Sequence, residues 1–387
     1  MKTIKRELSI KLPKKQSAFL WGARKTGKTT YLKEQYPDSL VYDFLKTDLY
    51  FDITKNASML RERILAQDVK KLKHPIILDE VQKVPGVLDE VHWLIENNGL
   101  SFILCGSSAR KLKRGHANLL GGRAWRYEMF PLVSREIGEV DLLRALNHGL
   151  IPVHYLQNDE ECRRSLEAYV QDYLREEIFA EGLARNIPAF SRFLDAFGYS
   201  HGEITNYCNI ARECGVDSKT VKEYYQILVD TLIAVRVEPY KKRQSRQVIT
   251  KASKYYLFDV GVPGYLTKRK LTEKRGAEFG KAFEHFMLME LTAYRSYSGK
   301  EFDINFWRTK SGFEVDFVLG SGEVALEVKG SGRIDRKDMR GLKAFAADNS
   351  PKKIILVCNE KEKRLHGKIE ILPWRAFLRQ LWKGEIL

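Results

Sequence analysis

The feature that most constrains this chain is a motif near its N-terminus, GARKTGKT at residues 22–29. It matches the phosphate-binding pattern G-x-x-x-x-G-K-[S/T] at every fixed position, and an apolar run at residues 17–21 precedes it. Gly22 and Gly27 let the loop curl so that its backbone N–H groups point at phosphate oxygens. A helix beginning near Lys28 presents the positive end of its dipole to the same anion. The motif therefore predicts a strand–loop–helix unit that binds a nucleoside triphosphate.

Two side chains of the motif have distinct expected roles. Lys28 would reach the β- and γ-phosphates, and the Thr29 hydroxyl would complete the ligand shell of Mg²⁺. The predicted cofactors are therefore ATP and Mg²⁺. The residues expected to contact the nucleotide are consecutive: Gly22, Ala23, Arg24, Lys25, Thr26, Gly27, Lys28, Thr29 and Thr30.

A second apolar run, HPIILDE at residues 74–80, ends in two carboxylates. Continuous apolar runs are typical of strands in parallel sheets, and ligands bind at the carboxyl ends of such strands. Asp79 is expected to hold Mg²⁺, and Glu80 to orient or deprotonate the attacking water. An exposed acidic turn is the alternative, but it is a poor explanation beside a phosphate-binding loop.

A third predicted strand, residues 100–105, is followed by Gly106, Ser107 and Ser108. A hydroxyl at a strand end can report on the γ-phosphate, so Ser107 or Ser108 is a candidate sensor; the alternative is a simple glycine–serine turn. Further along, Arg123 is either an arginine finger that acts in a neighbouring subunit or an ordinary surface cation.

Together, residues 21–30 and 77–85, the turn at 106–108 and the Gly122-Arg123 pair resemble a prokaryotic family of AAA-type ATPases. Members of that family carry a C-terminal domain related to PD-(D/E)xK nucleases, and the resemblance extends over nearly the whole chain. It implies an α/β fold class with three parts. These are a P-loop AAA-type ATPase domain at 1–150, a helical and winged-helix middle at 151–260, and a restriction-endonuclease-like mixed α/β domain at 261–387.

The middle of the chain has helical spacing of apolar residues over 149–178. Helices are then expected at 204–214 and 218–232 with a turn at Gly215, followed by a strand at 232–237. The segment 241–254 carries several Lys and Arg residues and no acid. It is either a β-wing that contacts DNA phosphates or part of a winged helix that serves only for packing.

Near the C-terminus, alternating patterns predict strands at 313–319 and 324–329, joined by a hairpin at 320–322. Side chains two residues apart share a strand face, so Glu327 and Lys329 point the same way and the hairpin can bring Asp316 beside them. Glu284 lies in the helical run that precedes these strands. Taken alone, this pattern also describes cross-strand ion pairs on an exposed hairpin.

The resemblance to PD-(D/E)xK nucleases adds roles for these side chains. It implies a divalent metal held by Glu284, Asp316 and Glu327, with Lys329 orienting the attacking water. Val315 stands where the family's proline would be.

The composition adds limits to these expectations. The chain has 387 residues and a formal net charge of +16, which favours a polyanionic partner or reflects a lysine-rich solvated surface. Five scattered cysteines fit a reducing cytoplasm, and no apolar run approaches the roughly 20 residues that a membrane span requires.

Two functions follow from these observations. The first is a DNA-associated ATPase whose nucleotide state controls a nuclease-like domain. The second is an ATP-dependent switch for oligomerisation or partner binding, with an inactive C-terminal scaffold. A homo-oligomer is a further expected partner state, in which Arg123 would act if it is an arginine finger.

Overall fold

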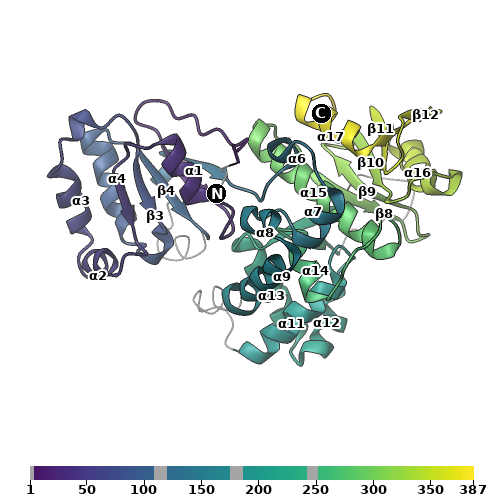
Figure 1. Ribbon diagram of the computed structural model, residues 1–387, viewed down its shortest axis with the longest axis horizontal. Helices are drawn as coiled ribbons and strands as arrows, with labels where there is room; N and C mark the ends of the chain where they lie inside the picture. Colours follow the sequence, from purple (N-terminus) through teal and green to yellow (C-terminus); the bar gives the residue numbers. More distant parts are fainter. Residues whose placement is uncertain (1–3, 109–119, 175–185, 242–251) are drawn as a thin grey trace. The chain divides into compact units, whose positions relative to one another are not determined.

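The computed structural model describes residues 4–108, 120–174, 186–241 and 252–387 (Figure 1). These residues form two compact units, which are described separately. One comprises residues 8–130 with 230–233 and contains the phosphate-binding motif; the other comprises residues up to 7, 131–229 and 234–387. In the described part of the chain, no helix combines the length and apolar character needed to cross a membrane.

The first unit is built on a parallel sheet with the strand order β2-β3-β4-β1-β5. Its strands are β1 (Ser17–Trp21), β2 (Val41–Asp43), β3 (Ile76–Asp79), β4 (Phe102–Gly106) and β5 (Ala124–Glu128). Strands β1, β3 and β4 are buried along their whole length, which explains their continuous apolar sequences. Because all pairings are parallel, the strands end at one edge of the sheet.

Helices α1 (Lys28–Gln35), α2 (Thr47–Lys55), α3 (Ser58–Leu65) and α4 (Val87–Asn98) complete the first unit. Apolar side chains of α2, α3 and α4 form one core cluster with those of the sheet, including Phe19, Leu78 and Leu104. The packed sheet thereby fixes the ends of β1, β3 and β4, where the predicted nucleotide residues lie.

The second unit begins with a group of helices, of which α7 and α8 share a core cluster with a large sheet (Figure 1). Its helices are α6 (Ser134–Ile137), α7 (Leu142–His148), α8 (Pro152–Leu156), α9 (Asp159–Ala168), the π-helix η4 (Tyr169–Leu174), α11 (Ile187–Ser200), α12 (Tyr207–Cys214), α13 (Ser218–Asp230) and α14 (Gly261–Leu266). Helices α15 (Ala277–Ser298), α16 (Arg340–Asn349) and α17 (Trp374–Lys383) follow.

The sheet of this unit has the strand order β12-β13-β11-β10-β9-β8-β6-β7. Its strands are β6 (Ala234–Pro239), β7 (Lys254–Leu257), β8 (Ile304–Arg308), β9 (Glu314–Leu319), β10 (Val324–Val328), β11 (Lys353–Cys358), β12 (Arg364–His366) and β13 (Ile369–Pro373). One core cluster includes residues of α15 and α17, and a second includes residues of α16. The sheet is therefore covered on both faces.

Several sequence-based expectations are confirmed. The strands at 17–21 and 76–79 follow the prediction, and the expected hairpin is the antiparallel pair β9–β10, which pairs Leu326 with Phe317. Helices α12 and α13, with the turn at Gly215 between them, also lie where the sequence predicted a helix–turn–helix. The domain boundaries at 150 and 260 stay predictions.

Of the two alternatives for 241–254, a β-wing that contacts DNA phosphates is wrong for the C-terminal end, and packing is what the structure shows there. Strands β6 and β7 do form an antiparallel pair, but Pro239 also pairs with Phe306 of β8, so the hairpin extends the large sheet. Lys254 is buried within that sheet rather than presented to a partner, with 4% of its surface exposed. The residues of the segment at 242–251 lie outside the described part.

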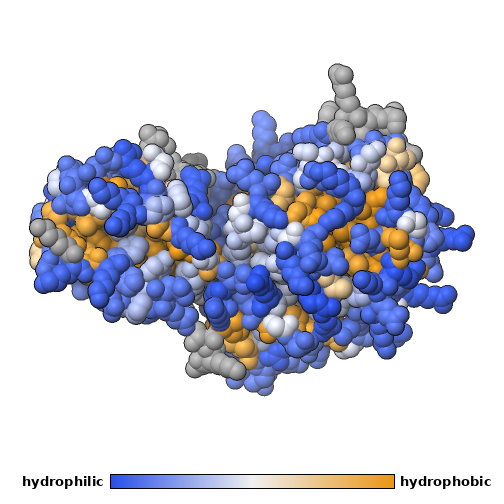
Figure 2. Space-filling model, turned by 90° about the horizontal axis from the view of Figure 1, so that it is seen from above, coloured by the Kyte–Doolittle hydropathy of each residue, from blue (hydrophilic) through white to orange (hydrophobic). Residues whose placement is uncertain are grey.

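Figure 2 shows polar residues over most of one face, with apolar patches between them. Large apolar side chains that lie at the surface include Phe51, Tyr199 and Leu365. Isolated exposed apolar residues are normal for folded proteins and identify no site.

Candidate functional site

The phosphate-binding motif folds as a loop between β1 and α1, with Lys28 as the first residue of the helix. A Cβ atom at Gly22 would lie 2.4 Å from the carbonyl oxygen of Met129, so this position accepts only glycine without displacing the backbone. The Lys28 ammonium is buried inside the loop and donates to the carbonyl oxygens of Gly22 (2.7 Å) and Ala23 (3.1 Å). The Thr26 hydroxyl closes the loop by donating to Ala23 at 2.8 Å.

The two predicted magnesium ligands of this unit meet at the edge of the sheet. The Thr29 hydroxyl, in the first turn of α1, donates to Oδ2 of Asp79 at 2.8 Å. Asp79 ends β3, and its other oxygen accepts from the backbone N–H of Glu80 at 3.0 Å. An oxygen pair of this kind suits Mg²⁺, which takes hydroxyl and carboxylate ligands.

Glu80 directly follows β3 and has a left-handed backbone, with φ of 57°. Such a conformation is uncommon for a non-glycine residue and is found at constrained functional positions. Burial raises the pKa of the Glu80 carboxyl, and the positive charges of Lys28 and Arg24 oppose this shift. The charges of the loop therefore act directly on the predicted catalytic carboxylate.

Gln82 connects Glu80 to the next strand. Its side-chain amide donates to Oε2 of Glu80 at 2.5 Å and to the Ser107 hydroxyl at 3.0 Å. Gln82 is 3% exposed, and Ser107 and Ser108 are buried just beyond β4. Gln82 has no role among the sequence-based predictions, although the run Asp79-Glu80-Val81-Gln82 was the available signal. The structure thus brings Glu80 and the candidate sensor Ser107 together through a residue that the analysis left unassigned.

Arg123, the candidate arginine finger, lies between the turn at Leu120–Gly122 and strand β5. Its guanidinium forms an ion pair with Glu96 of helix α4, and both side chains are substantially exposed. An action of Arg123 in a neighbouring subunit stays a prediction.

The predicted nuclease-like residues lie in the second unit, on β9, β10 and α15. Leu326 pairs with Phe317 in the antiparallel register, so the next pair along the two strands places Glu327 opposite Asp316. Asp316 is 7% and Glu327 5% exposed, and Oδ2 of Asp316 accepts from the backbone N–H of Val328 at 2.8 Å. Lys329 forms an ion pair with Glu327 at 2.6 Å.

Lys254, which was predicted to belong to the basic segment 241–254, joins this group. The ammonium of Lys254, on β7, lies 2.8 Å from Oε1 of Glu314 and 3.6 Å from Oε1 of Glu284. The Tyr256 hydroxyl, on the same strand, donates to Glu284 at 2.5 Å. Glu284 therefore reaches the group from α15 and is held there by two side chains of β7. Spacing along the chain could not reveal this, because β7 joins the sheet only through tertiary pairing.

The carboxylates of this group affect one another. Burial raises the pKa of Asp316 well above its usual range, and the charges of Glu327 and Glu284 raise it further. Burial also raises the pKa of Glu327 to about 7, against the opposing charge of Lys329. We call Glu284, Glu314, Asp316, Glu327, Lys254 and Lys329 the acid–lysine cluster.

Two observations bear on whether the acid–lysine cluster suits a divalent metal. Oε2 of Glu327 is buried and has no hydrogen-bond partner, so one carboxylate oxygen is left for a ligand. On the other hand, nowhere in the described residues do three His, Cys, Asp or Glu side chains form a group that could hold a metal ion. Lys254 and Lys329 occupy part of the space and balance part of the charge. The cluster as it stands fits a partial metal site at most.

Comparison with known families divides the chain into three matches. Residues 14–138 match the family described as AAA domain. Residues 139–273 and 279–377 match two domains of unknown function, DUF8612 and DUF4143. The first of these regions contains the motif, Asp79, Glu80 and Ser107, and it has the parallel sheet described above. The match and the parallel sheet together support the fold of an AAA-type ATPase for residues 14–138.

Two curated relatives, both described as uncharacterized proteins, are similar to this chain over most of its length. One from Mycobacterium tuberculosis is 24% identical over 311 residues, covering 78% of this chain and 66% of the relative. One from Methanocaldococcus jannaschii is 23% identical over 435 residues, covering 95% of this chain and 86% of the relative. The chain thus spans slightly less than two thirds of the mycobacterial relative.

Two solved structures share a weak likeness. Domain III of the Thermotoga maritima replication initiation protein DnaA matches with a TM-score of 0.25 and 19% identity, covering 56% of this chain and 84% of that one. A signal-transduction ATPase with a tetratricopeptide-repeat sensor from Pyrococcus horikoshii matches with a TM-score of 0.19 and 11% identity, covering 73% and 47%. Both scores are low, and neither likeness bears on the function.

Proposed function

We propose that the AAA domain binds ATP with Mg²⁺ and hydrolyses it. The observation that carries this proposal is the 2.8 Å hydrogen bond between Thr29 and Asp79 beside the buried Lys28. Three parts of a nucleotide site, from a loop, a helix and a separate strand, meet there. Thr29 and Asp79 would hold Mg²⁺, which neutralises charge on the phosphates when bound.

The remaining residues have separable tasks. Lys28 and the loop N–H groups bind the phosphates, and Lys28 leaves its two carbonyl partners for this purpose. Glu80 orients the attacking water and accepts its proton, which a raised pKa favours. Gln82 holds the Glu80 carboxylate and connects it to Ser107, so the hydrolytic residue and the sensor respond together.

Substitution of Lys28 and Glu80 tests this proposal. Lys28→Ala should weaken nucleotide binding and abolish hydrolysis, because the β/γ-phosphates lose their counter-ion. Glu80→Gln should bind ATP as the parent does and release phosphate at least roughly 10²-fold more slowly, which is the scale of general-base catalysis. Binding is measured with a fluorescent ATP analogue and hydrolysis by phosphate release. Hydrolysis by Glu80→Gln at the parental rate would remove Glu80 from the catalytic role.

We also propose that the second unit acts on DNA through the acid–lysine cluster, under control of the nucleotide state. The unpartnered oxygen of Glu327 and the convergence of Asp316 and Glu327 support this role. DNA is the partner that we propose, because a net charge of +16 favours a polyanion. In this proposal Asp316 and Glu327 supply the metal ligands, and Lys329 orients water.

A specific observation favours a second function, the ATP-dependent switch with an inactive scaffold. Lys254 and Lys329 already balance the carboxylates, and the described residues include no ready three-carboxylate metal group. Calorimetric titration of Mn²⁺ into the full chain, beside a cleavage assay on duplex, branched and single-stranded DNA, separates the two. Saturable binding with DNA cleavage supports the nuclease-like function, and absence of both supports the scaffold.

A further inference from the structure

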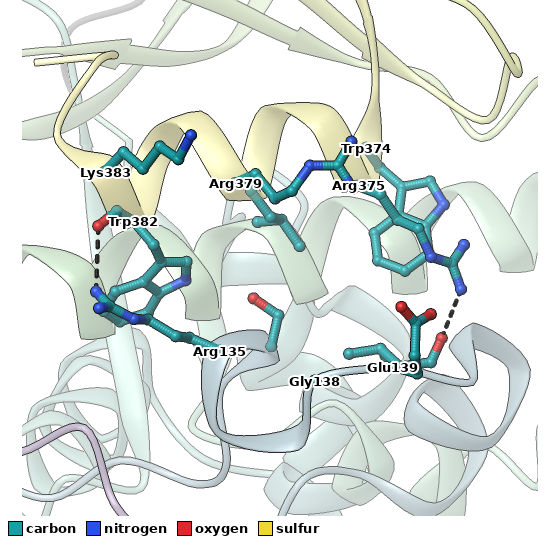
Figure 3. A pocket seen from close by; sticks show the side chains of 11 residues that line it. Arg135, Gly138, Glu139, Trp374, Arg375, Arg379, Trp382 and Lys383 are labelled. Atoms are coloured by element: carbon teal, nitrogen blue, oxygen red, sulfur yellow. Dashed lines mark hydrogen bonds between the residues drawn. The ribbon is translucent and has the colours of Figure 1, made fainter.

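A basic hollow lies in the second unit, between residues 134–140 and helix α17 (Figure 3). It encloses about 490 Å³. Four cations line it: Arg375, Arg379 and Lys383 from α17, with Arg135 across from them. Among the described residues of its lining, Glu139 is the one acid. The hollow therefore carries a strong local excess of positive charge.

The sequence of α17 explains why its cations face outward. Trp374, Phe377, Leu378 and Leu381 are buried, and they belong to the core cluster beneath the helix. Arg375, Arg379 and Lys383 follow one another at intervals of four residues, so they form one exposed row. With a rise of 1.5 Å per residue, the row is about 12 Å long.

The four cations of the hollow differ in whether they have partners within the protein. The Arg375 guanidinium lies 4.2 Å from the Trp374 ring and donates to the carbonyl oxygen of Val140 at 2.8 Å (Figure 3). Arg135 forms an ion pair with Glu7 at 3.1 Å. Arg379 and Lys383 form no ion pair with any residue that the structure describes. These two cations are therefore available to an external anion.

A second hollow of about 660 Å³ continues the charge beyond Arg379. It shares Trp374, Arg375 and Arg379 with the first hollow and adds the exposed cations Lys274, Lys361 and Lys363. The acid in its lining, Glu360, is paired with Arg364 at 2.9 Å. We call the seven cations of the two hollows the α17 basic strip: Arg135, Lys274, Lys361, Lys363, Arg375, Arg379 and Lys383.

We propose that the α17 basic strip binds the phosphate backbone of duplex DNA independently of sequence. Along one strand, DNA presents a phosphate about every 3.4 Å of its axis, so a row about 12 Å long spans about three phosphates. Arginine and lysine contacts to phosphates position a protein on DNA without reading bases. The proposal shares its partner with the proposed function, but it requires neither ATP hydrolysis nor the acid–lysine cluster.

Charge and burial favour DNA over an anionic membrane. A helix that binds a membrane surface inserts its apolar face into the lipid. The apolar face of α17 is already buried in the core, with Phe377 and Leu381 fully covered. The exposed positions Arg375, Arg379 and Lys383 therefore offer charge, and evenly spaced charge is what a nucleic-acid backbone presents.

The test uses the full chain without nucleotide or metal, and fluorescence anisotropy of a labelled mixed-sequence duplex over a range of salt concentrations. The double variant Arg379→Gln/Lys383→Gln removes the two cations without ion pairs. Its matched control is Lys310→Gln/Lys343→Gln, which removes two exposed cations outside the strip. ATP hydrolysis without DNA should be parental in both variants.

We expect the strip variant to bind more weakly and its slope of log affinity against log salt to flatten by about 1.8, or about 0.9 for each lost phosphate contact. The control should keep the parental slope. An unchanged slope in the strip variant, or an equal change in the control, would overturn the proposal. Binding to two other anions is measured in parallel: vesicles rich in phosphatidylserine, and free polyglutamate. If the strip variant binds DNA as the parent does but no longer binds one of these other anions, the strip is a site for that anion instead.

Discussion

Gly106→Ala tests the connection between Glu80, Gln82 and Ser107. Gly106 ends β4, and a Cβ atom there would lie 2.2 Å from Oε1 of Gln82 and 2.9 Å from Cζ3 of Trp21. An ordinary contact between such atoms is about 3.5 Å, so the Gln82 amide must move by about 1 Å. Its hydrogen bonds of 2.5 and 3.0 Å to Glu80 and Ser107 cannot both survive that movement.

The expected loss follows from the size of the displacement. A catalytic group misplaced by about 1 Å costs roughly 10²-fold in rate. The three atoms nearest to the added methyl group belong to Gln82 and Trp21, and not to Lys28, Thr29 or Asp79. ATP binding should therefore stay within about twofold of the parent, well under the 1.4 kcal/mol of a tenfold change. Phosphate release under single-turnover conditions and titration of a fluorescent ATP analogue measure the two effects separately.

Two controls separate the clash with Gln82 from the general effect of an added methyl group. Gly86→Ala adds the same methyl group in the same unit, but its nearest neighbour, Cβ of Ala57, would be 3.9 Å away, so it should hydrolyse ATP at the parental rate. Gln82→Ala removes the clashing amide, and adding Gly106→Ala to it should cause little further loss. Parental hydrolysis by Gly106→Ala would refute the role of Gln82, and an equal loss of ATP binding would show a general collapse of the loop.

The remaining predictions concern the second unit. Asp316→Asn should abolish any Mn²⁺ binding that calorimetry detects, whereas Lys329→Ala should keep the metal and lose cleavage; cleavage by Asp316→Asn at the parental rate would exclude the acid–lysine cluster as the site. Glu290 is buried, accepts from Ser134 and Trp382, and has its pKa raised by burial to about 7. Because the folded state favours the protonated form of Glu290, the stabilisation from this carboxyl is complete below about pH 4.5 and is lost as the pH rises through about 7. Between pH 4.5 and 8, the free energy of unfolding of the parent, measured with denaturant, should therefore fall by about 3 kcal/mol relative to that of Glu290→Gln. Parallel curves of unfolding free energy against pH would contradict this.

Local sequence was sufficient to predict the fold of the phosphate-binding motif. Gly22 to Thr29 are consecutive, and their geometry depends on one strand–loop–helix unit, so the motif alone predicted it. Asp79 and Glu80 were identified because a parallel sheet brings strand ends to one edge, a property that an apolar run already implies. The β9–β10 hairpin was predictable for a similar reason, since a short turn and a period of two fix its register.

Long-range pairing decided the rest. Lys254 belongs to a basic segment by composition, yet the pairing of β6 with β8 draws its hairpin into the large sheet and places the ammonium against Glu314 and Glu284. The α17 basic strip likewise combines residues 135, 274 and 361–383, which no spacing along the chain relates. The sequence by itself determined the strand–loop–helix at residues 17–35 and the strand-end position of Asp79 and Glu80, because their geometry is set within short segments or by one sheet edge. Only the tertiary structure decided which charges meet across the second unit, because those contacts depend on how distant elements pack.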